Sequence, residues 1–218
     1  MDEQAHYNVR HAGPRMSGDE ALARLVEGNE RYVQRTPRDS GMRLDDFVEL
    51  AKGQQPYATI LGCADSRVPP ELIFDAGPGE LFVIRVAGNV LAPEVAGSLQ
   101  YAGRHLKTPL FMVLGHDHCG AVSAALASRN EGVRHHSRIQ LLIDGILPAL
   151  EQVDASQPPE AQLASAVHAN VRATARAILD SPEARERVAE GSMFVLAGAV
   201  YELATGRVRL LDIDGLNS

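Results

Sequence analysis

The chain has 218 residues, of which 45% are apolar and 22% are charged, a balance typical of a globular protein rather than a disordered one. A chain of this length can form one compact domain with helical arms. The formal net charge of −7 gives little support to nucleic-acid binding, and no apolar run reaches the ~20 residues that span a bilayer. The N-terminus has no apolar core of the secretory type, so we expect a cytoplasmic protein without nucleic-acid or membrane partners.

The first part of the chain predicts two helices. Residues 1–18 are polar and aperiodic, and we expect them to form a loose N-terminal arm. Within the segment 19–53, apolar residues first recur at helical spacing, with Ser17 and Glu20 placed to form a capping box. A second, short helix is expected in LDDFVELAKG, where Gly53 is the stop signal. The apolar stripe of this helical arm needs a surface to cover it, and a partner subunit is one such surface.

Short apolar runs separated by helical segments fill most of the remaining sequence. This alternation predicts an α/β fold, with a mostly parallel central sheet flanked by helices and joined by right-handed crossovers. The chain is expected to end in a hairpin strand, and residues 19–218 are expected to form a single domain. The predicted strands are 57–63, 81–88, 109–116 and 192–203, the helical segments are 94–106 and 119–128, and further helices lie in 137–190.

Chemically reactive side chains follow two of the predicted strands. Cys63 ends one strand in LGCADSR, and His116 and Cys119 end another in VLGHDHCGA. Because the carboxyl ends of parallel strands meet at one edge of a sheet, these three side chains can converge. Two thiolates and one imidazole suit Zn²⁺, with ligand distances of ~2.0–2.3 Å, and three protein ligands leave one tetrahedral position open. The pattern therefore predicts a catalytic zinc site.

Asp65 and Arg67 follow Cys63 at every second position, so an extended backbone directs all three side chains to the same side. The carboxylate can accept a hydrogen bond from water on the metal or bind the metal itself, and Arg67 can hold it through a bidentate pair. A structural metal site and a thiol redox sensor are competing interpretations. The Asp–Arg pair argues against the first, and the absence of a CxxC motif argues against the second.

CADSR, followed about fifty residues later by HDHC, resembles the CxDxR and HxxC motifs of the β-class carbonic anhydrases. The resemblance extends over most of residues 19–213. It implies a zinc-dependent lyase that hydrates CO2 reversibly to bicarbonate and a proton through a zinc-bound hydroxide. The implied zinc ligands are Cys63, His116 and Cys119. Asp65 and Arg67 are implied to be the catalytic dyad that orients the hydroxide.

The resemblance also implies residues that bind the substrate. Gln54 matches a glutamine that donates to the substrate across a dimer interface. Phe82, Ala87 and Tyr101 match positions that line a small apolar pocket for CO2, although Ala87 stands where family members typically have Val. Gly120 matches the glycine that follows the second Cys ligand. The implied assembly is a homodimer, which in many family members pairs into a tetramer.

Two questions stay open at this level. One subtype of the family carries a Trp three residues before the first Cys, as part of a bicarbonate site that switches the enzyme off. Here that position is Ile60, although Arg85 and Tyr101 match the other members of that site. Hydrolysis of CS2 or COS by the same zinc site is an alternative that the ligands do not distinguish. Because two thiolates offset the charge of zinc, we expect activity that rises toward alkaline pH.

Overall fold

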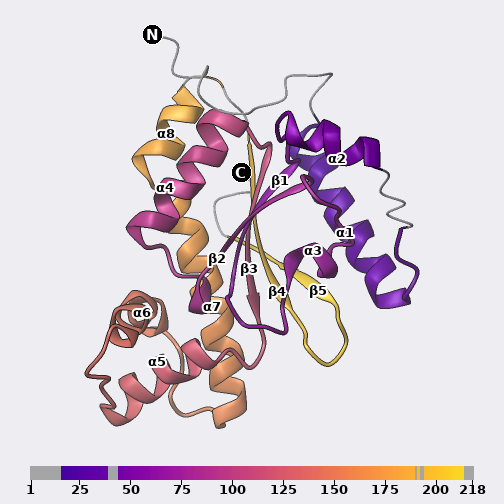
Figure 1. The fold of residues 1–218 in the computed structure, drawn as a ribbon. Helices are drawn as coiled ribbons and strands as arrows, with labels where there is room; N and C mark the ends of the chain where they lie inside the picture. Colours follow the sequence, from indigo (N-terminus) through magenta and orange to yellow (C-terminus); the bar gives the residue numbers. More distant parts are fainter. Residues whose placement is uncertain (1–15, 39–43, 190, 192–193, 214–218) are drawn as a thin grey trace.

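The computed structural model describes residues 16–38, 44–189, 191 and 194–213. A five-stranded sheet with the strand order β2-β1-β3-β4-β5 forms its centre (Figure 1). The first four strands are parallel, and β5 pairs antiparallel with β4, so the predicted fold class is confirmed. The strands are β1 (Ala58–Gly62), β2 (Leu81–Arg85), β3 (Leu110–His116), β4 (Val195–Tyr201) and β5 (Val208–Leu211).

The apolar runs of the sequence become the inner strands. Every residue of β1 and of β3 is buried, as expected for parallel strands that are covered by helices on both faces. β2 lies at the edge of the sheet and is only half-buried. The strand predicted at 81–88 ends early, at Arg85, because a short helix that includes Gly88 with φ 70° follows it. Of the strand predicted at 192–203, β4 forms the central part, and residues 192–193 lie outside the described residues.

Helices cover both faces of the sheet. In Figure 1, α1, α2 and α3 lie on one side, α4, α7 and α8 lie on the other, and α5 and α6 gather beyond the carboxyl ends of the strands. The helices are α1 (Gly18–Gln34), α2 (Leu44–Ala51), α3 (Pro70–Ile73), α4 (Pro93–Tyr101), α5 (Gly120–Glu131), α6 (Ile139–Ile146), α7 (Pro159–Leu179) and α8 (Pro182–Ala189). Shorter helical turns are η2 (Ala87–Asn89), η3 (Ala102–Leu106) and η4 (Leu147–Leu150).

The predicted capping box at the start of α1 is present. The Ser17 hydroxyl accepts a hydrogen bond from the backbone N–H of Glu20 at 3.2 Å, and the Glu20 carboxylate accepts one from the Ser17 N–H at 2.7 Å. α1 buries Ala21 and Leu25 completely in the core of its own chain. The contact of residues 19–53 with a partner subunit stays a prediction.

α7 packs closely on the middle of the sheet because two of the facing strand residues are glycines. A Cβ atom on Gly115 of β3 would lie 2.5 Å from the Cγ2 atom of Val171, far inside a normal contact. Gly198 of β4 meets the same helix, since its Cβ would lie 3.1 Å from Val171. This close approach brings Asn170 of α7 near the carboxyl edge of the sheet.

None of the helices that the structure describes has both the length and the apolar character needed to cross a bilayer.

Candidate metal centre

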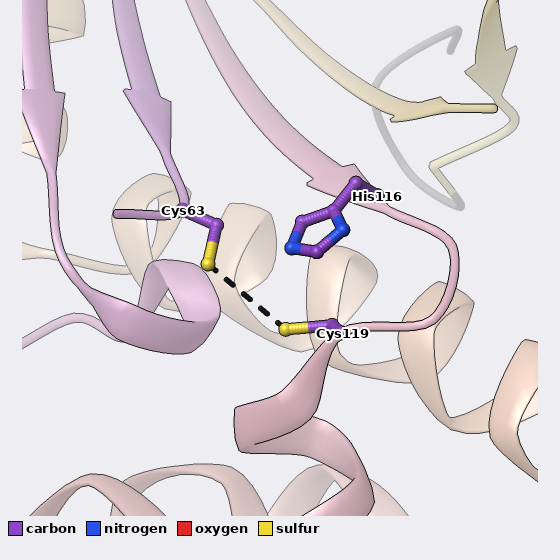
Figure 2. Close-up of side chains that lie close together, drawn as sticks. All are labelled: Cys63, His116 and Cys119. Carbon is purple, nitrogen blue, oxygen red and sulfur yellow. Dashed lines mark hydrogen bonds between the residues drawn. The ribbon is translucent and has the colours of Figure 1, made fainter. Parts of the chain in front are cut away.

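Three side chains from three elements converge at the carboxyl edge of the sheet. Cys63 follows β1, His116 is the last residue of β3, and Cys119 is the N-cap of α5. Figure 2 shows the three side chains pointing toward one another. Their ligand atoms all lie within 4.8 Å of one another, and the two sulfur atoms are 4.0 Å apart. The turn between the two later ligands holds His118 in the left-handed region, with φ 49°. The predicted convergence is confirmed.

These residues fit a metal ion of the zinc type. All three are buried, with 4%, 1% and 2% of Cys63, His116 and Cys119 exposed. The Nδ1 atom of His116 lies 2.8 Å from the carbonyl oxygen of Asp117, to which it can donate, and this fixes the tautomer that leaves Nε2 with a free lone pair. That Nε2 is buried and has no hydrogen-bond partner in residues 16–38, 44–189, 191 and 194–213. A buried nitrogen without a partner is costly, and a cation held with two thiolates would satisfy it.

The environment of Cys63 favours its thiolate. The sulfur accepts hydrogen bonds from the backbone N–H groups of Gly88 and Asp65, each at 3.4 Å. The hydrogen bond from the Cys119 thiol, helped by His116 and these N–H groups, outweighs burial and lowers the pKa of Cys63 to about 4. The pKa of His116 is raised because its contacts with Cys63 outweigh the effect of burial. Of the two thiols, Cys63 is therefore the one that gives up its proton more readily.

Cys119 is the partner that keeps the proton in this pair. Its hydrogen bond to Cys63, together with burial, raises the pKa of Cys119 above its ordinary value. The backbone N–H groups of Ala121 and Val122, in the first turn of α5, favour the thiolate but do not outweigh these effects. A metal ion that binds both sulfur atoms must therefore displace one proton.

Asp65 and Arg67 form a bidentate pair beside the three ligands. Asp65 Oδ1 accepts hydrogen bonds from the backbone N–H and the Nε–H of Arg67, both at 2.9 Å, and Oδ2 accepts one from Nη2 at 2.7 Å. These bonds hold the pKa of Asp65 well below its usual range. Oδ2 also lies 3.8 Å from the Nε2 atom of His116. A carboxylate that is ionised at neutral pH thus lies beside His116.

Phe82 and Tyr101 lie together, but Phe82 pairs with Thr59, three residues before the end of β1, and not beside Cys63. The rings of Phe82 on β2 and Tyr101 at the end of α4 stack, with their centroids 5.7 Å apart and an angle of 29° between the planes. His105, one turn further along, lies against Tyr101 at a centroid distance of 5.4 Å. Ala87 opens the short helix that follows β2, and Gly120 is the first residue of α5.

Gln54 is not brought to the metal centre of its own chain. It lies between α2 and β1, before the amino end of the strand, whereas Cys63 follows the carboxyl end of the same strand. Because β1 is extended, it separates its two ends by roughly 13 Å. Ile60, at the position where one subtype has Trp, is fully buried inside β1.

Two residues that support the centre were not predicted from the sequence. Asn170 of α7 is 2% exposed and donates a hydrogen bond from Nδ2 to the carbonyl oxygen of Gly88 at 2.8 Å. The N–H of that same glycine donates to the Cys63 sulfur. Gly88 has φ 70°, a conformation that other residues rarely adopt, so a substitution there would strain the backbone that carries the donor. The only sequence signal was a polar Asn on the apolar side of a long helix.

Comparisons with known proteins agree with this geometry. A family model described as carbonic anhydrase matches residues 58–208. Carbonic anhydrase 2 of Mycobacterium tuberculosis is 40% identical over 199 residues, covering 88% of this chain and 91% of the relative. A β-carbonic anhydrase of Coccomyxa, solved with acetazolamide, has a TM-score of 0.71 at 29% identity and covers 87% of this chain and 86% of its own. A structure from a study of two tetrameric β-carbonic anhydrases of Sordaria macrospora has a TM-score of 0.70 at 24% identity, with coverages of 87% and 96%, and shows the shared fold alone.

Proposed function

The chain belongs to the β-class carbonic anhydrase family, whose members are lyases, and from that premise we propose that it catalyses the reversible hydration of CO2 to bicarbonate and a proton. The proposed cofactor is Zn²⁺, held by Cys63, His116 and Cys119. The observation that carries this proposal is the convergence of the three ligand atoms within 4.8 Å of one another. The buried Nε2 of His116, without a hydrogen-bond partner in the described part of the chain, supports it further.

When bound, zinc acts as a Lewis acid that makes hydroxide available from water near neutral pH. Cys63, His116 and Cys119 would supply three ligands to it, and water or substrate would complete its coordination. The new bond forms between the hydroxide oxygen and the carbon of CO2, while one C=O electron pair moves onto oxygen to give bicarbonate. The proton lost by the water leaves to buffer.

Asp65 and Arg67 are proposed to be the dyad that orients the nucleophile. Because its pKa is held well below the usual range, Asp65 stays a carboxylate at working pH and can only accept a hydrogen bond. A hydroxide that donates its hydrogen to Oδ2 has its lone pairs directed away from Asp65 and available for CO2. Arg67 occupies both carboxylate oxygens and so fixes the direction of the remaining lone pairs.

Phe82, Ala87, Tyr101 and Gly120 are proposed to line the site for CO2, which needs an apolar slot rather than strong binding. The stacked rings of Phe82 and Tyr101 form an apolar surface, toward the amino end of the sheet relative to the centre of their own chain. At Gly120, an added Cβ would meet no heavy atom within 4 Å in the described part of the chain, so this position beside Cys119 leaves open space.

We also propose a homodimer, with tetramers as a further step, in which Gln54 reaches the site of the partner subunit. The support is that Gln54 lies near the amino end of β1, away from the centre of its own chain. The neighbouring helix α2 exposes Phe47 and Val48, each at 56%, as a surface that association would cover. The mass of the native protein in sedimentation tests this assembly. Two buried free cysteines suit a reducing compartment, and we propose a cytoplasmic location.

The decisive experiment measures zinc content and CO2 hydration for the wild type and for Asp65→Ala. We expect both proteins to hold zinc, and kcat of the variant to fall by about 10²- to 10⁴-fold, since it lacks the group that positions the proton. Asp154→Ala is a matched control, because Asp154 also accepts from the N–H two residues later, at 2.8 Å, but lies outside the site. Its kcat should match the wild type.

Each part of the proposal has its own contrary outcome. Full activity in Asp65→Ala would refute the dyad and leave the zinc site standing. Wild-type protein without zinc or without CO2 hydration would refute the function itself. CS2 and COS are assayed in parallel, and faster turnover of either than of CO2 would establish the alternative substrate.

A further inference from the structure

Arg85 reaches from the neighbouring strand to both ends of the segment that carries Cys63 and Asp65. It is the last residue of β2. Its Nε donates to the carbonyl oxygen of Cys63 at 3.0 Å, and its Nη2 donates to the carbonyl oxygen of Asp65 at 2.5 Å. One guanidinium group is thus hydrogen-bonded to the main chain of Cys63, a proposed metal ligand, and to the main chain of Asp65, the carboxylate residue of the proposed dyad.

The carbonyl group of Cys63 needs a donor because the sheet opens at this point. The pairing of β1 with β3 ends at Gly62 and Leu114, so no β3 ladder continues beside Cys63. On the β2 side the ladder does continue, from Val86 N to Gly62 O at 3.1 Å and from Ala64 N to Val86 O at 3.3 Å. The Arg85 side chain adds hydrogen bonds to the carbonyl groups of Cys63 and Asp65, the second of which also accepts one from the Val68 N–H at 3.2 Å.

The segment therefore stays extended from the end of β1 as far as Asp65, where a turn closed by the Val68 N–H begins, and this keeps the period of two between Cys63 and Asp65. That period aims the sulfur and the carboxylate at the same space. Arg67 cannot supply this restraint, because it lies on the same segment, two residues later, and its side chain is 52% exposed. Arg85, together with the main-chain bonds of Val86, ties the segment to β2.

We propose that Arg85 is a positioning residue for the dyad, which holds the Cys63–Asp65 main chain so that Asp65 faces the metal centre. This inference rests on the proposed role of Asp65. It gives Arg85 a task different from the bicarbonate site of the Trp-containing subtype, since here its guanidinium is bonded to two main-chain carbonyls and Ile60 is buried.

The test compares Arg85→Met with Arg172→Met. Arg172 is a matched control because its Nε also donates to a main-chain carbonyl at 3.0 Å, that of Asp212, away from the site. We expect Arg85→Met to keep its zinc and its KM but to lose about 10- to 100-fold in kcat, the usual cost of removing a group that orients a metal site. Arg85→Lys, which keeps the charge but cannot span two carbonyls, should lose activity as well. Full activity in either Arg85 variant would overturn the inference.

Amide hydrogen exchange gives a readout that does not depend on activity. In Arg85→Met, exchange should rise in the peptide that covers residues 62–68, with or without zinc, and stay unchanged in Arg172→Met. Unchanged exchange in Arg85→Met would overturn the inference.

A double-mutant cycle shows whether Arg85 acts through Asp65. In the Asp65→Asn background, Arg85→Met should change kcat by less than twofold, because the carboxylate to be positioned is gone. Multiplicative losses would mean that Arg85 acts elsewhere, and would overturn the inference. Failure of the dyad itself appears differently, as activity retained by Asp65→Asn alone.

Discussion

Two polar clusters lie at opposite ends of the same sheet, and they differ in how completely their members are paired. The amino-end cluster consists of Arg24, Arg31, Arg38, Asp75 and Glu80. Arg31 pairs with Asp75 at 2.6 Å, Arg38 pairs with Glu80 at 2.6 Å, and Arg24 also contacts Glu80. Both carboxylates have partners, and the side chains lie partly in solvent.

The metal centre at the carboxyl end is buried and incomplete. The Nε2 of His116 has no hydrogen-bond partner in the part of the chain that the structure describes, and the two sulfur atoms of Cys63 and Cys119 lie beside it. A charged cluster whose groups are hydrogen-bonded to one another needs no ligand. A buried cluster that contains a nitrogen without a hydrogen-bond partner is stabilised when a ligand binds. We therefore infer that the amino-end cluster stabilises the fold and that the metal centre binds a ligand.

The largest expected effect comes from removing one ligand of the metal centre. Cys63→Ser replaces a thiolate with a hydroxyl that binds zinc poorly at neutral pH, so we expect loss of nearly all zinc and a fall in CO2 hydration of at least about a thousandfold. Metal analysis of the purified variant, with the hydration rate, checks this. Full zinc and full activity in Cys63→Ser would show that Cys63 is not a metal ligand.

The fold and the ligands of the centre could be predicted because their signals are local. Continuous apolar runs such as those of β1 and β3 indicate strands buried on both faces. The capping box of Ser17 and Glu20 placed the start of α1 within one residue. The HxxC and CxDxR spacings placed reactive side chains at strand ends, where a parallel sheet collects them.

The groups that support the centre could not be predicted, because their roles depend on contacts between distant segments. Asn170 is connected to Cys63 through Gly88: Asn170 donates to the carbonyl of Gly88, and the N–H of Gly88 donates to Cys63. These contacts exist only because α7 packs on the sheet. Arg85 is 22 residues after Cys63 in the sequence, and only the strand order makes it a neighbour. Gln54 likewise lies away from the metal centre of its own chain because of the direction of β1, and the number of residues between Gln54 and Cys63 does not reveal this.

A smaller effect is expected from pH. Two thiolate ligands offset the 2+ charge of zinc, so water in this site is acidified less than in a site with neutral ligands, and kcat should rise from pH 6 to pH 9 by about tenfold or more. Asp65 adds no inflection in that range, because its pKa is depressed and it loses its charge only as pH falls far below neutrality. Stopped-flow hydration at constant ionic strength measures the profile. A flat profile would contradict the argument from ligand charge.

The smallest effect is expected at the amino-end cluster, and it should appear in stability rather than in catalysis. Glu80→Gln removes the partner of Arg24 and Arg38, and we expect unfolding in urea at pH 7 to cost about 1–2 kcal/mol less, while zinc content and kcat stay at wild-type values. Burial opposes the charge of Glu80, but hydrogen bonds from Arg38 and from the Gly77 N–H lower its pKa.

The pH dependence of that stability difference separates an ion pair from simple packing. Because the pKa of Glu80 in the folded chain lies below its ordinary value of 4.5, the contribution is present above that value and is lost as pH falls through the lowered pKa. The difference between the wild type and Glu80→Gln, measured on metal-free protein, should therefore shrink under acidic conditions. A difference that persists unchanged in acid would mean that Glu80 stabilises the cluster by packing, and a loss of activity would remove the contrast between the two ends of the sheet.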